Sequence, residues 1–267
     1  MERSRRNDVW AAGDRYEPYV GRWSRLVARE FLEWLAAPKA RDWLDVGCGT
    51  GALTQSILDH ADPCAVKGVD ASPAFLEHAK ARVSDARVHF EVGDAQSLAL
   101  DAASVDAAVS GLVLNFVPQP LRAASEMARV VRPGGIVAAY VWDYAGRMEM
   151  MRYFWDAAVA MDPAAYDLDE GLRFPICSPG PLAELFEQAG LRDVRTRAID
   201  ISCAFRDFDD YWSPFLGGQG PAPGYLMSLN DERRAALREL IGVRLPVNDD
   251  GSIRLIARAW SVKGLAQ

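Results

Sequence analysis

Three glycines and an acidic residue near the start of the chain form the pattern with the clearest chemical meaning. Gly47, Gly49 and Gly51 stand at alternate positions directly after an apolar run that carries Asp45. Such glycines permit a tight turn and let the backbone approach a ligand, while a helix over residues 52–60 would direct its first amides toward the same place. The pattern indicates a pocket for a nucleoside cofactor, although a tight turn without any ligand is the simpler alternative.

Two further acids follow later apolar runs. Asp70 ends the next run, where a carboxylate can accept hydrogen bonds from both hydroxyls of a ribose. Asp94 follows the run after that. The carboxylate of Asp45 suits a cofactor that carries an ammonium group and would repel a pyrophosphate. Asp70 and Asp94 also have ordinary interpretations, as a helix cap and as a loop residue.

These acids and glycines must be positioned by the elements around them. Strand-like and helix-like segments alternate over the first half of the chain, which is typical of a parallel sheet with helices on both faces. The carboxyl ends of such strands meet at one edge of the sheet, where ligands bind. The run Arg132-Pro133-Gly134-Gly135 should stop a helix and turn the chain into a strand. We predict strands over residues 43–46, 65–70, 87–92, 105–110 and 136–142, and helices over residues 52–60, 73–84 and 120–131.

The regular alternation breaks after residue 142. We predict an amphipathic helix over residues 148–161, a helix over 181–189, and two long antiparallel strands at a sheet edge over 194–205 and 252–262. An insertion, residues 206–250, separates these two strands. Its glycine-rich stretch, residues 217–224, should be a flexible loop able to act as a hinge or lid, and a polar helix should follow over 230–241.

Composition limits the class of protein. The chain has 267 residues, of which 50% are hydrophobic and 25% are charged, as expected of one globular domain with a sizeable core. A net charge of −7 argues against a nucleic-acid partner. Four scattered cysteines without a C-x-x-C pair predict neither a metal site nor disulfides. No apolar run follows the basic start or reaches membrane length, so we expect a cytoplasmic protein. The oligomeric state, monomer or homodimer, stays open.

The motifs together resemble those of a known family. The stretch over residues 45–51, Gly68-Val69-Asp70-Ala71-Ser72, Gly93-Asp94-Ala95 and the 132–135 turn are similar to the motifs of class I S-adenosylmethionine-dependent methyltransferases. The closest branch acts on small molecules and is called type 11, or ubiquinone/menaquinone-biosynthesis-like. The resemblance implies an α/β fold, a Rossmann-like doubly wound sheet of seven strands that is mostly parallel with one antiparallel edge strand.

The resemblance also implies a domain plan and a cofactor. A single methyltransferase domain, residues 1–267, would comprise a helical N-terminal cover (1–37), a cofactor-binding core (40–142), a helical lid (143–180) and the insertion as a substrate cap (206–250). The cofactor would be S-adenosyl-L-methionine, with S-adenosyl-L-homocysteine as the product. Its binding residues would be Asp45, Gly47, Gly49, Thr50, Gly51, Asp70, Ala71, Ser72, Asp94, Ala95, Gly111, Leu112 and Asn115.

An aromatic segment precedes the core. Tyr16, Tyr19 and Arg22 lie at helical spacing, and a similar tyrosine-rich segment folds over the cofactor in the relatives that the chain resembles. We therefore expect these three residues to contact the cofactor, with Arg22 placed to meet a carboxylate. An aromatic stripe that packs on the core is an equally good interpretation.

The histidines do not predict a general base. His60, His78 and His89 all fall on segments assigned to the scaffold, and Asn115 stands where many relatives have a histidine. Attack on the methyl group by an O, N, C or S atom would then depend mainly on alignment of the reactants. Asp143 and Tyr144, just after a predicted strand, are the candidate catalytic residues, although both also fit an ordinary loop.

Aromatic residues and methionines predict the kind of acceptor. They are Phe116, Trp142, Met151, Trp155, Tyr211 and Trp212, which would suit an apolar or aromatic small molecule. The same residues would suit an ordinary core or a dimer interface. Two other functions stay open, namely a non-catalytic module that binds S-adenosylmethionine and an NAD-dependent oxidoreductase on a related sheet.

Overall fold

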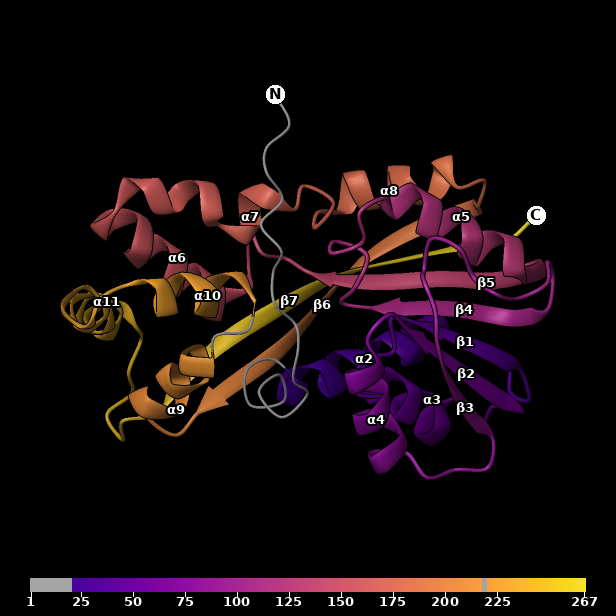
Figure 1. Cartoon of the computed structure of the whole chain (residues 1–267), viewed down its shortest axis with the longest axis horizontal. Helices are drawn as coiled ribbons and strands as arrows, with labels where there is room; N and C mark the ends of the chain where they lie inside the picture. Colours follow the sequence, from indigo (N-terminus) through magenta and orange to yellow (C-terminus); the bar gives the residue numbers. More distant parts are fainter. Residues whose placement is uncertain (1–20, 218–219) are drawn as a thin grey trace.

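The computed structural model describes residues 21–217 and 220–267. Figure 1 shows two lobes, a sheet with helices on both sides and a smaller helical lobe, joined by the long strands β6 and β7. Within the described residues, no helix is both long and apolar enough to cross a membrane.

The larger lobe is built on one seven-stranded sheet in the order β3-β2-β1-β4-β5-β7-β6. Six strands run parallel, and β7 runs antiparallel between β5 and β6. The predicted fold class is therefore confirmed. The strands are β1 (Asp42–Val46), β2 (Ala65–Asp70), β3 (Val88–Val92), β4 (Val105–Gly111), β5 (Val131–Trp142), β6 (Arg192–Phe205) and β7 (Ile253–Leu265).

Helices cover both faces of this sheet, as Figure 1 shows. The central strands are covered on both faces, so most residues of β1 and β4 are buried and the majority of these are apolar. One face is covered by α2 (Arg22–Leu35), α3 (Ala52–His60) and α4 (Pro73–Arg82), and the other by α5 (Pro120–Val130) and α8 (Pro179–Gln188). Ser72 caps α4 as its spacing before Pro73 suggests, because its hydroxyl accepts a hydrogen bond from the amide of Phe75 at 3.4 Å.

The predicted turn at residues 132–135 is wrong in one respect, because β5 already begins at Val131. Val131 pairs with Val105, and the register then shifts so that Ile136 pairs with Ala107. A Cβ on Gly135 would lie 2.5 Å from the carbonyl oxygen of Asp106. The glycines therefore form an irregularity inside the strand, where the backbone of β4 passes too close for a side chain.

The smaller lobe, which we call the cap, is formed by two segments that are far apart in the sequence. The first follows β5 and contains α6 (Glu149–Met161), the 3-10 helix η2 (Pro163–Leu168) and α7 (Glu170–Arg173). The second lies between β6 and β7 and contains α9 (Phe208–Trp212), η3 (Ser213–Gly217), α10 (Pro221–Ser228) and α11 (Asp231–Arg244). Helices α10 and α11 both pack on α6.

The cap has an aromatic core of its own. The ring of Phe154 stacks on Phe215 with centroids 4.8 Å apart, and Trp155 and Tyr225 pack beside them. Tyr211 joins the same cluster and is fully buried. The two inserted segments build this aromatic core together, and Tyr211 joins it to Phe205 of β6, with ring centroids 5.4 Å apart.

The expected flexible loop at residues 217–224 is also wrong, because α10 begins at Pro221 and Gly217 ends η3. Pro221 and Pro223 stand in the first turn of α10, where a proline costs no hydrogen bond and its fixed φ suits the helix. Both prolines and Ala222 are buried. Residues 218 and 219 lie outside the described residues.

Candidate active site

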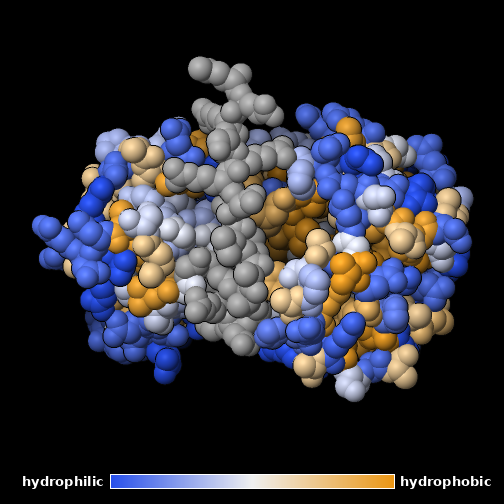
Figure 2. All heavy atoms as spheres, in the orientation of Figure 1, coloured by the Kyte–Doolittle hydropathy of each residue, from blue (hydrophilic) through white to orange (hydrophobic). Residues whose placement is uncertain are grey.

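A cavity of about 400 Å³ opens where the carboxyl ends of β1, β2, β4 and β5 meet. Its walls come from α2, the glycine loop after β1, the β2–α4 junction, the segment after β4, and β5. Figure 2 shows a hollow with hydrophobic walls near the middle of one face, between the two lobes. The lining residues are Ser24, Gly47, Cys48, Gly49, Thr50, Ala52, Leu53, Asp70, Ala71, Ser72, Phe75, Gly111, Leu112, Val113, Phe116 and Tyr140.

The glycine loop forms the floor of this cavity. Gly47, Gly49 and Gly51 all have positive φ angles, of 72°, 53° and 84°, a conformation that costs other residues free energy. A Cβ on Gly47 would lie 2.6 Å from a methyl carbon of Val113, whereas a Cβ on Gly49 would meet nothing within 4 Å. Gly47 is therefore required by its neighbours, while Gly49 leaves open space for a ligand.

Asp70 stands at the end of β2 and holds the loop in place. One carboxylate oxygen accepts a hydrogen bond from the amide of Gly49 at 2.9 Å, and the other accepts one from the amide of Ser72 at 2.8 Å. Burial raises the pKa of Asp70, and these two amide hydrogen bonds oppose the rise. The sequence correctly brings Asp70 to the glycine loop.

Asp45 lies beneath the loop and does not line the cavity. It is fully buried, and one carboxylate oxygen accepts a hydrogen bond from the hydroxyl of Thr54 at 2.7 Å. Burial raises the pKa of Asp45 to about 7, with a smaller rise from the charge of Asp70, against the hydrogen bond from Thr54. The oxygen Oδ1 has no hydrogen-bond partner in the described part of the chain.

The segment after β4 contributes Gly111, Leu112 and Phe116 to the lining, as the sequence predicts. Leu112 has a φ of 63°, and its amide donates to the carbonyl of Tyr140 at 2.8 Å. Asn115 is buried outside the lining, and its Nδ2 has no partner among residues 21–217 and 220–267. Asn115 therefore contacts no part of this cavity.

Asp94 and Ala95 lie beyond the cavity wall, after β3. Asp94 is exposed, and its carboxylate accepts hydrogen bonds from the backbone and side-chain amides of Gln96 at 2.9 and 3.1 Å. These contacts lower the pKa of Asp94. The expected contact of Asp94 with the cofactor stays a prediction.

Several lining residues are absent from the sequence prediction. Tyr140 lies near the end of strand β5, Phe75 in the first turn of α4, and Ser24 at the start of α2. The period-two pattern of β5 identifies one face of the strand, but only its pairing with β4, which sets Tyr140 opposite Gly111, brings that side chain to the cavity.

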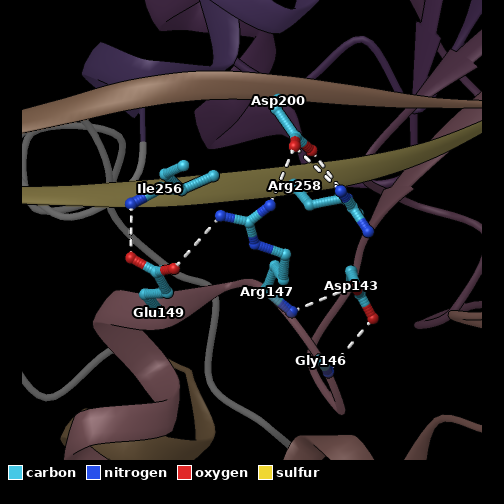
Figure 3. Close-up of polar contacts among 7 residues, drawn as sticks. All are labelled: Asp143, Gly146, Arg147, Glu149, Asp200, Ile256 and Arg258. Atoms are coloured by element: carbon cyan, nitrogen blue, oxygen red, sulfur yellow. Dashed lines mark hydrogen bonds and ion pairs between the residues drawn. The ribbon is translucent and has the colours of Figure 1, made fainter.

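Asp143 and Tyr144, the candidate catalytic residues, lie outside the lining of the cavity. Figure 3 shows the Asp143 carboxylate within the turn after β5, where it accepts hydrogen bonds from the amides of Gly146 at 3.1 Å and Arg147 at 2.9 Å. Tyr144 is buried and packs against Phe174. Neither residue lines the cavity, so Asp143 stabilises a turn and Tyr144 belongs to the packing.

The predicted substrate residues of the cap stay a prediction, and the structure places them away from the cavity. Met151, Trp155, Tyr211 and Trp212 are buried, and none lines the cavity. Trp155 donates a hydrogen bond to the carboxylate of Glu170, and the hydroxyl of Tyr211 donates to the carbonyl of Met150 at 2.8 Å. These side chains pack in the aromatic core of the cap, which accounts for the amphipathic pattern of the sequence.

Trp142, the remaining aromatic candidate, is buried at the end of β5 and also lies outside the lining. Its Nε1 has no hydrogen-bond partner among the described residues. Trp142 therefore has no contact in this structure that supports acceptor binding.

The N-terminal prediction is tested only at Arg22, because Tyr16 and Tyr19 lie outside the described residues. Arg22 meets a carboxylate as expected, but it is the carboxylate of Asp210 in α9, at 3.2 Å. The guanidinium also lies over the rings of Trp23 and Phe205, 4.4 and 4.8 Å from their centroids. Arg22 thus ties α2 to the cap and does not line the cavity.

No histidine of the chain lines the cavity, since all three lie in described segments elsewhere. Among the residues that the structure describes, no group of three histidine, cysteine or acidic side chains is placed to hold a metal ion.

Comparison with known proteins identifies the family. Residues 44–139 match the family described as "Methyltransferase domain". The chain is 30% identical to the demethylmenaquinone methyltransferase of Roseiflexus castenholzii over 184 residues, which cover 63% of this chain and 75% of that protein. The chain belongs to the class I S-adenosylmethionine-dependent methyltransferases. This membership decides against an NAD-dependent oxidoreductase.

Two other relatives match over shorter stretches. The malonyl-[acyl-carrier protein] O-methyltransferase of Hahella chejuensis is 34% identical over 95 residues, which are 36% of this chain and 34% of that protein. The match to an uncharacterized transposon protein of Streptomyces fradiae, 34% identical, also spans only 34% of that protein and 42% of this chain. The chain therefore spans about a third of the length of these two relatives.

Solved structures of other proteins share the fold. Phosphoethanolamine N-methyltransferase 2 of Haemonchus contortus, in complex with phosphomonomethylethanolamine and S-adenosylhomocysteine, aligns with a TM-score of 0.59 at 15% identity, over 95% of this chain and 58% of that one. The [4+2]-cyclase SpnF aligns with a TM-score of 0.52 at 16% identity, over 90% and 81%.

S-adenosylmethionine is the methyl donor of this family, and the cavity has the features needed to hold it. Gly49 is open toward the cavity, and Asp70 presents a fixed carboxylate at its wall. The unpartnered oxygen of Asp45 lies beneath the loop, where negative charge favours a cationic amino group. When bound, the donor supplies a methyl group on a positively charged sulfur, which is already a good leaving group.

Proposed function

We propose that this methyltransferase acts on a small apolar or aromatic acceptor. The supporting observation is the composition of the cavity lining, in which apolar side chains predominate. The apolar side chains that line it are Leu53, Phe75, Leu112, Val113 and Phe116. A wall of this kind favours ligands that lose little hydration on entry.

Aromatic packing continues behind this wall. The ring of Phe116 meets Phe174 edge to face, with centroids 5.1 Å apart, and Phe174 in turn packs on Tyr144. Phe174 follows the short helix α7 of the cap. We assign the acceptor to the space beside Phe116, so that the segment over residues 143–180 acts as its lid and the insertion over 206–250 supports that lid.

The donor-binding part of the proposal uses the remaining lining residues. Asp70 would accept hydrogen bonds from the ribose hydroxyls, and Gly47, Gly49 and Ser72 would surround the nucleoside. Asp45 would act from beneath the loop through its charge. The proposal includes a single domain and a cytoplasmic location, and the net charge of −7 supports an acceptor other than nucleic acid.

Catalysis would come mainly from alignment. The cavity wall excludes water and holds the acceptor in line with the methyl group, and such positioning can lower a barrier by about 7–11 kcal/mol. The absence of histidine from the lining supports this mode of action. The names of two relatives, a demethylmenaquinone methyltransferase and a malonyl-[acyl-carrier protein] O-methyltransferase, support acceptors other than nucleic acid.

A transfer assay tests the choice of acceptor. The full chain is incubated with methyl-labelled S-adenosylmethionine and matched panels of hydroxynaphthalenes, substituted phenols and arylamines, or of short hydrophilic amines and acids. We expect labelled product from the aromatic panel only. Product from the hydrophilic panel alone would contradict the proposal, and binding of S-adenosylhomocysteine without any transfer would favour a non-catalytic module.

Substitution of Asp70 tests the donor assignment. In Asp70→Asn an NH2 group replaces one carboxylate oxygen, and this group can no longer accept a hydrogen bond. We therefore expect the affinity for S-adenosylhomocysteine to fall by about tenfold or more. Titration calorimetry measures this change. Asp249→Asn, at an exposed position far from β2, is the matched control, and equal affinities for the wild type and Asp70→Asn would refute the role of Asp70.

A further inference from the structure

The cavity has two distinct ends along the sheet. It crosses the ends of β2, β1, β4 and β5, which are neighbours in that order. Adjacent strands lie about 4.8 Å apart, so the distance from β2 to β5 is roughly 14 Å. Asp70 marks the β2 end and Tyr140 marks the β5 end.

The side chain of Tyr140 is held firmly at its end of the cavity. Tyr140 is only 2% exposed, and its ring packs on Phe31 of α2 with centroids 4.8 Å apart. It stands opposite Gly111 in the pairing of β4 with β5, and a Cβ on Gly111 would lie 2.5 Å from the phenol oxygen. Because Gly111 has no side chain, the Tyr140 hydroxyl group can occupy the space that a Cβ would fill.

Two other polar residues lie on this side of the sheet. Ser24 also lines the cavity, and its hydroxyl donates to the carbonyl of Gly21 at 2.7 Å, which leaves the oxygen free to accept. Asp45 stands on β1 and shares a face of the sheet with Tyr140, because Asp45 pairs with Val109 and Val109 pairs with Ala138. Its unpartnered oxygen is buried. The cavity therefore has hydroxyl groups from Ser24 and Tyr140 in its lining, in contrast to the apolar side chains beside Phe116, while the carboxyl of Asp45 lies beneath the loop at β1.

We infer that Tyr140 binds the amino-acid end of the methyl donor. The inference rests on the proposed contact of Asp70 with the ribose. If the ribose lies at β2, the part of the donor beyond it must extend across β1 toward β4 and β5, and that part carries a carboxylate and an ammonium group. A phenol hydroxyl can donate a hydrogen bond to the carboxylate, and an ionised acceptor makes such a bond stronger.

Two ligands distinguish a role of Tyr140 in binding the amino-acid end from a role in packing alone. S-adenosylhomocysteine contains the amino-acid end, whereas 5′-methylthioadenosine keeps the nucleoside and the sulfur but lacks it. We expect Tyr140→Phe to weaken S-adenosylhomocysteine by about tenfold or more in titration calorimetry. The affinity for 5′-methylthioadenosine should change by less than about twofold, because the lost hydroxyl does not contact the nucleoside.

Gly111→Ala provides a second variant, because its methyl group would displace the Tyr140 hydroxyl and should produce the same selective loss. Tyr153→Phe, on α6 and outside the lining, is the control and should change neither affinity.

Other outcomes have definite meanings. An equal loss of both ligands in Tyr140→Phe, or no loss of either, would overturn the assignment of Tyr140. Failure of the wild type to bind either ligand would instead overturn the donor site itself, which keeps the two failures distinct.

Discussion

Two glycines of the loop owe their identity to different causes. Gly47 has a positive φ and no room for a methyl group beside Val113, whereas Gly49 has a positive φ and open space. We therefore expect Gly47→Ala to lower the free energy of unfolding by about 2–4 kcal/mol. Gly49→Ala should cost only about 1–2 kcal/mol, since it carries the backbone penalty alone.

Chemical denaturation measures both values, and binding separates the two variants further. The methyl group of Gly49→Ala would project into the cavity, so its affinity for S-adenosylhomocysteine should fall although the fold remains. Equal losses of stability in the two variants would contradict this explanation.

The protonation of Asp45 makes donor binding depend on pH. Burial holds the pKa of Asp45 near 7 in the free protein, and an ammonium group above the loop should lower it. Binding therefore releases a proton, and the affinity for S-adenosylhomocysteine should weaken as pH falls below about 7. Calorimetry at pH 6.5, in buffers with different enthalpies of ionisation, detects the released proton.

Asp45→Asn removes the titrating group and should abolish this dependence on the buffer. A wild-type enthalpy that is the same in every buffer would show that Asp45 does not lose a proton on binding.

Sequence reasoning succeeds at residues whose role follows from local spacing. Gly47, Gly49 and Asp70 lie where their positions after buried strands predict. Tyr140 could not be identified, because its contact depends on which strands become neighbours and in which register. Asp143 shows the reverse case, since it follows a strand end as predicted, but the sequence does not reveal that two amides of the next turn donate hydrogen bonds to its carboxylate.

At the scale of elements, α7 is too short to be stable alone and is held by its neighbours. Asp169, its N-cap, forms an ion pair with Arg152 at 2.6 Å, and Glu170 accepts a hydrogen bond from Trp155. A Cβ on Gly171 would lie 2.9 Å from the Cα of Ala145, so α7 packs directly on the turn after β5. These contacts fix the position of Phe174, which follows α7.

The buried carboxyl of Glu170 should make this anchorage sensitive to pH. Burial raises the pKa of Glu170 to about 8, from an ordinary value of 4.5, and the hydrogen bond from Trp155 opposes the rise. The folded protein then binds the proton more tightly than the unfolded chain. Glu170 therefore lowers stability progressively from about pH 4.5 to pH 8, by at most about 1.4 kcal/mol per pH unit.

Glu170→Gln keeps the shape without the charge. We expect the variant to match the wild type near pH 5 and to exceed its free energy of unfolding near pH 9, as measured by denaturation at both values. Parallel pH profiles for the two proteins would show that Glu170 does not ionise in this range.

The helices of the cap show where sequence patterns lose information. The spacing of Met151 and Trp155 correctly predicts an amphipathic helix, α6. It does not reveal whether a ligand or another helix covers the apolar face. Here α9, η3 and α10 cover it, and these come from a segment about 60 residues later in the chain.

At the scale of the whole molecule, the hydrophobic interior consists of the sheet lobe and the cap core. Phe154 is fully buried in the cap core, and truncation to alanine should lower the free energy of unfolding by about 3–5 kcal/mol. Because Phe154 does not line the cavity, protein that remains folded should bind S-adenosylhomocysteine as the wild type does.

Denaturation and calorimetry on the same samples check both statements. Tyr211→Phe serves as the milder comparison, since it removes only the hydrogen bond to the Met150 carbonyl, at a cost of about 1 kcal/mol. A loss of donor affinity with unchanged stability in Phe154→Ala would restore the cap core as part of the binding site.

Strands β6 and β7 pair from Arg192–Leu265 to Phe205–Ile253, and they pass through both lobes. Melting of either lobe alone would have to break this ladder partway along its length. The two lobes should consequently unfold in one cooperative transition, and calorimetric and van't Hoff enthalpies should agree. Movements that admit an acceptor must then come from short connections such as the one carrying Phe174, because a rotation of the whole cap would bend two paired strands.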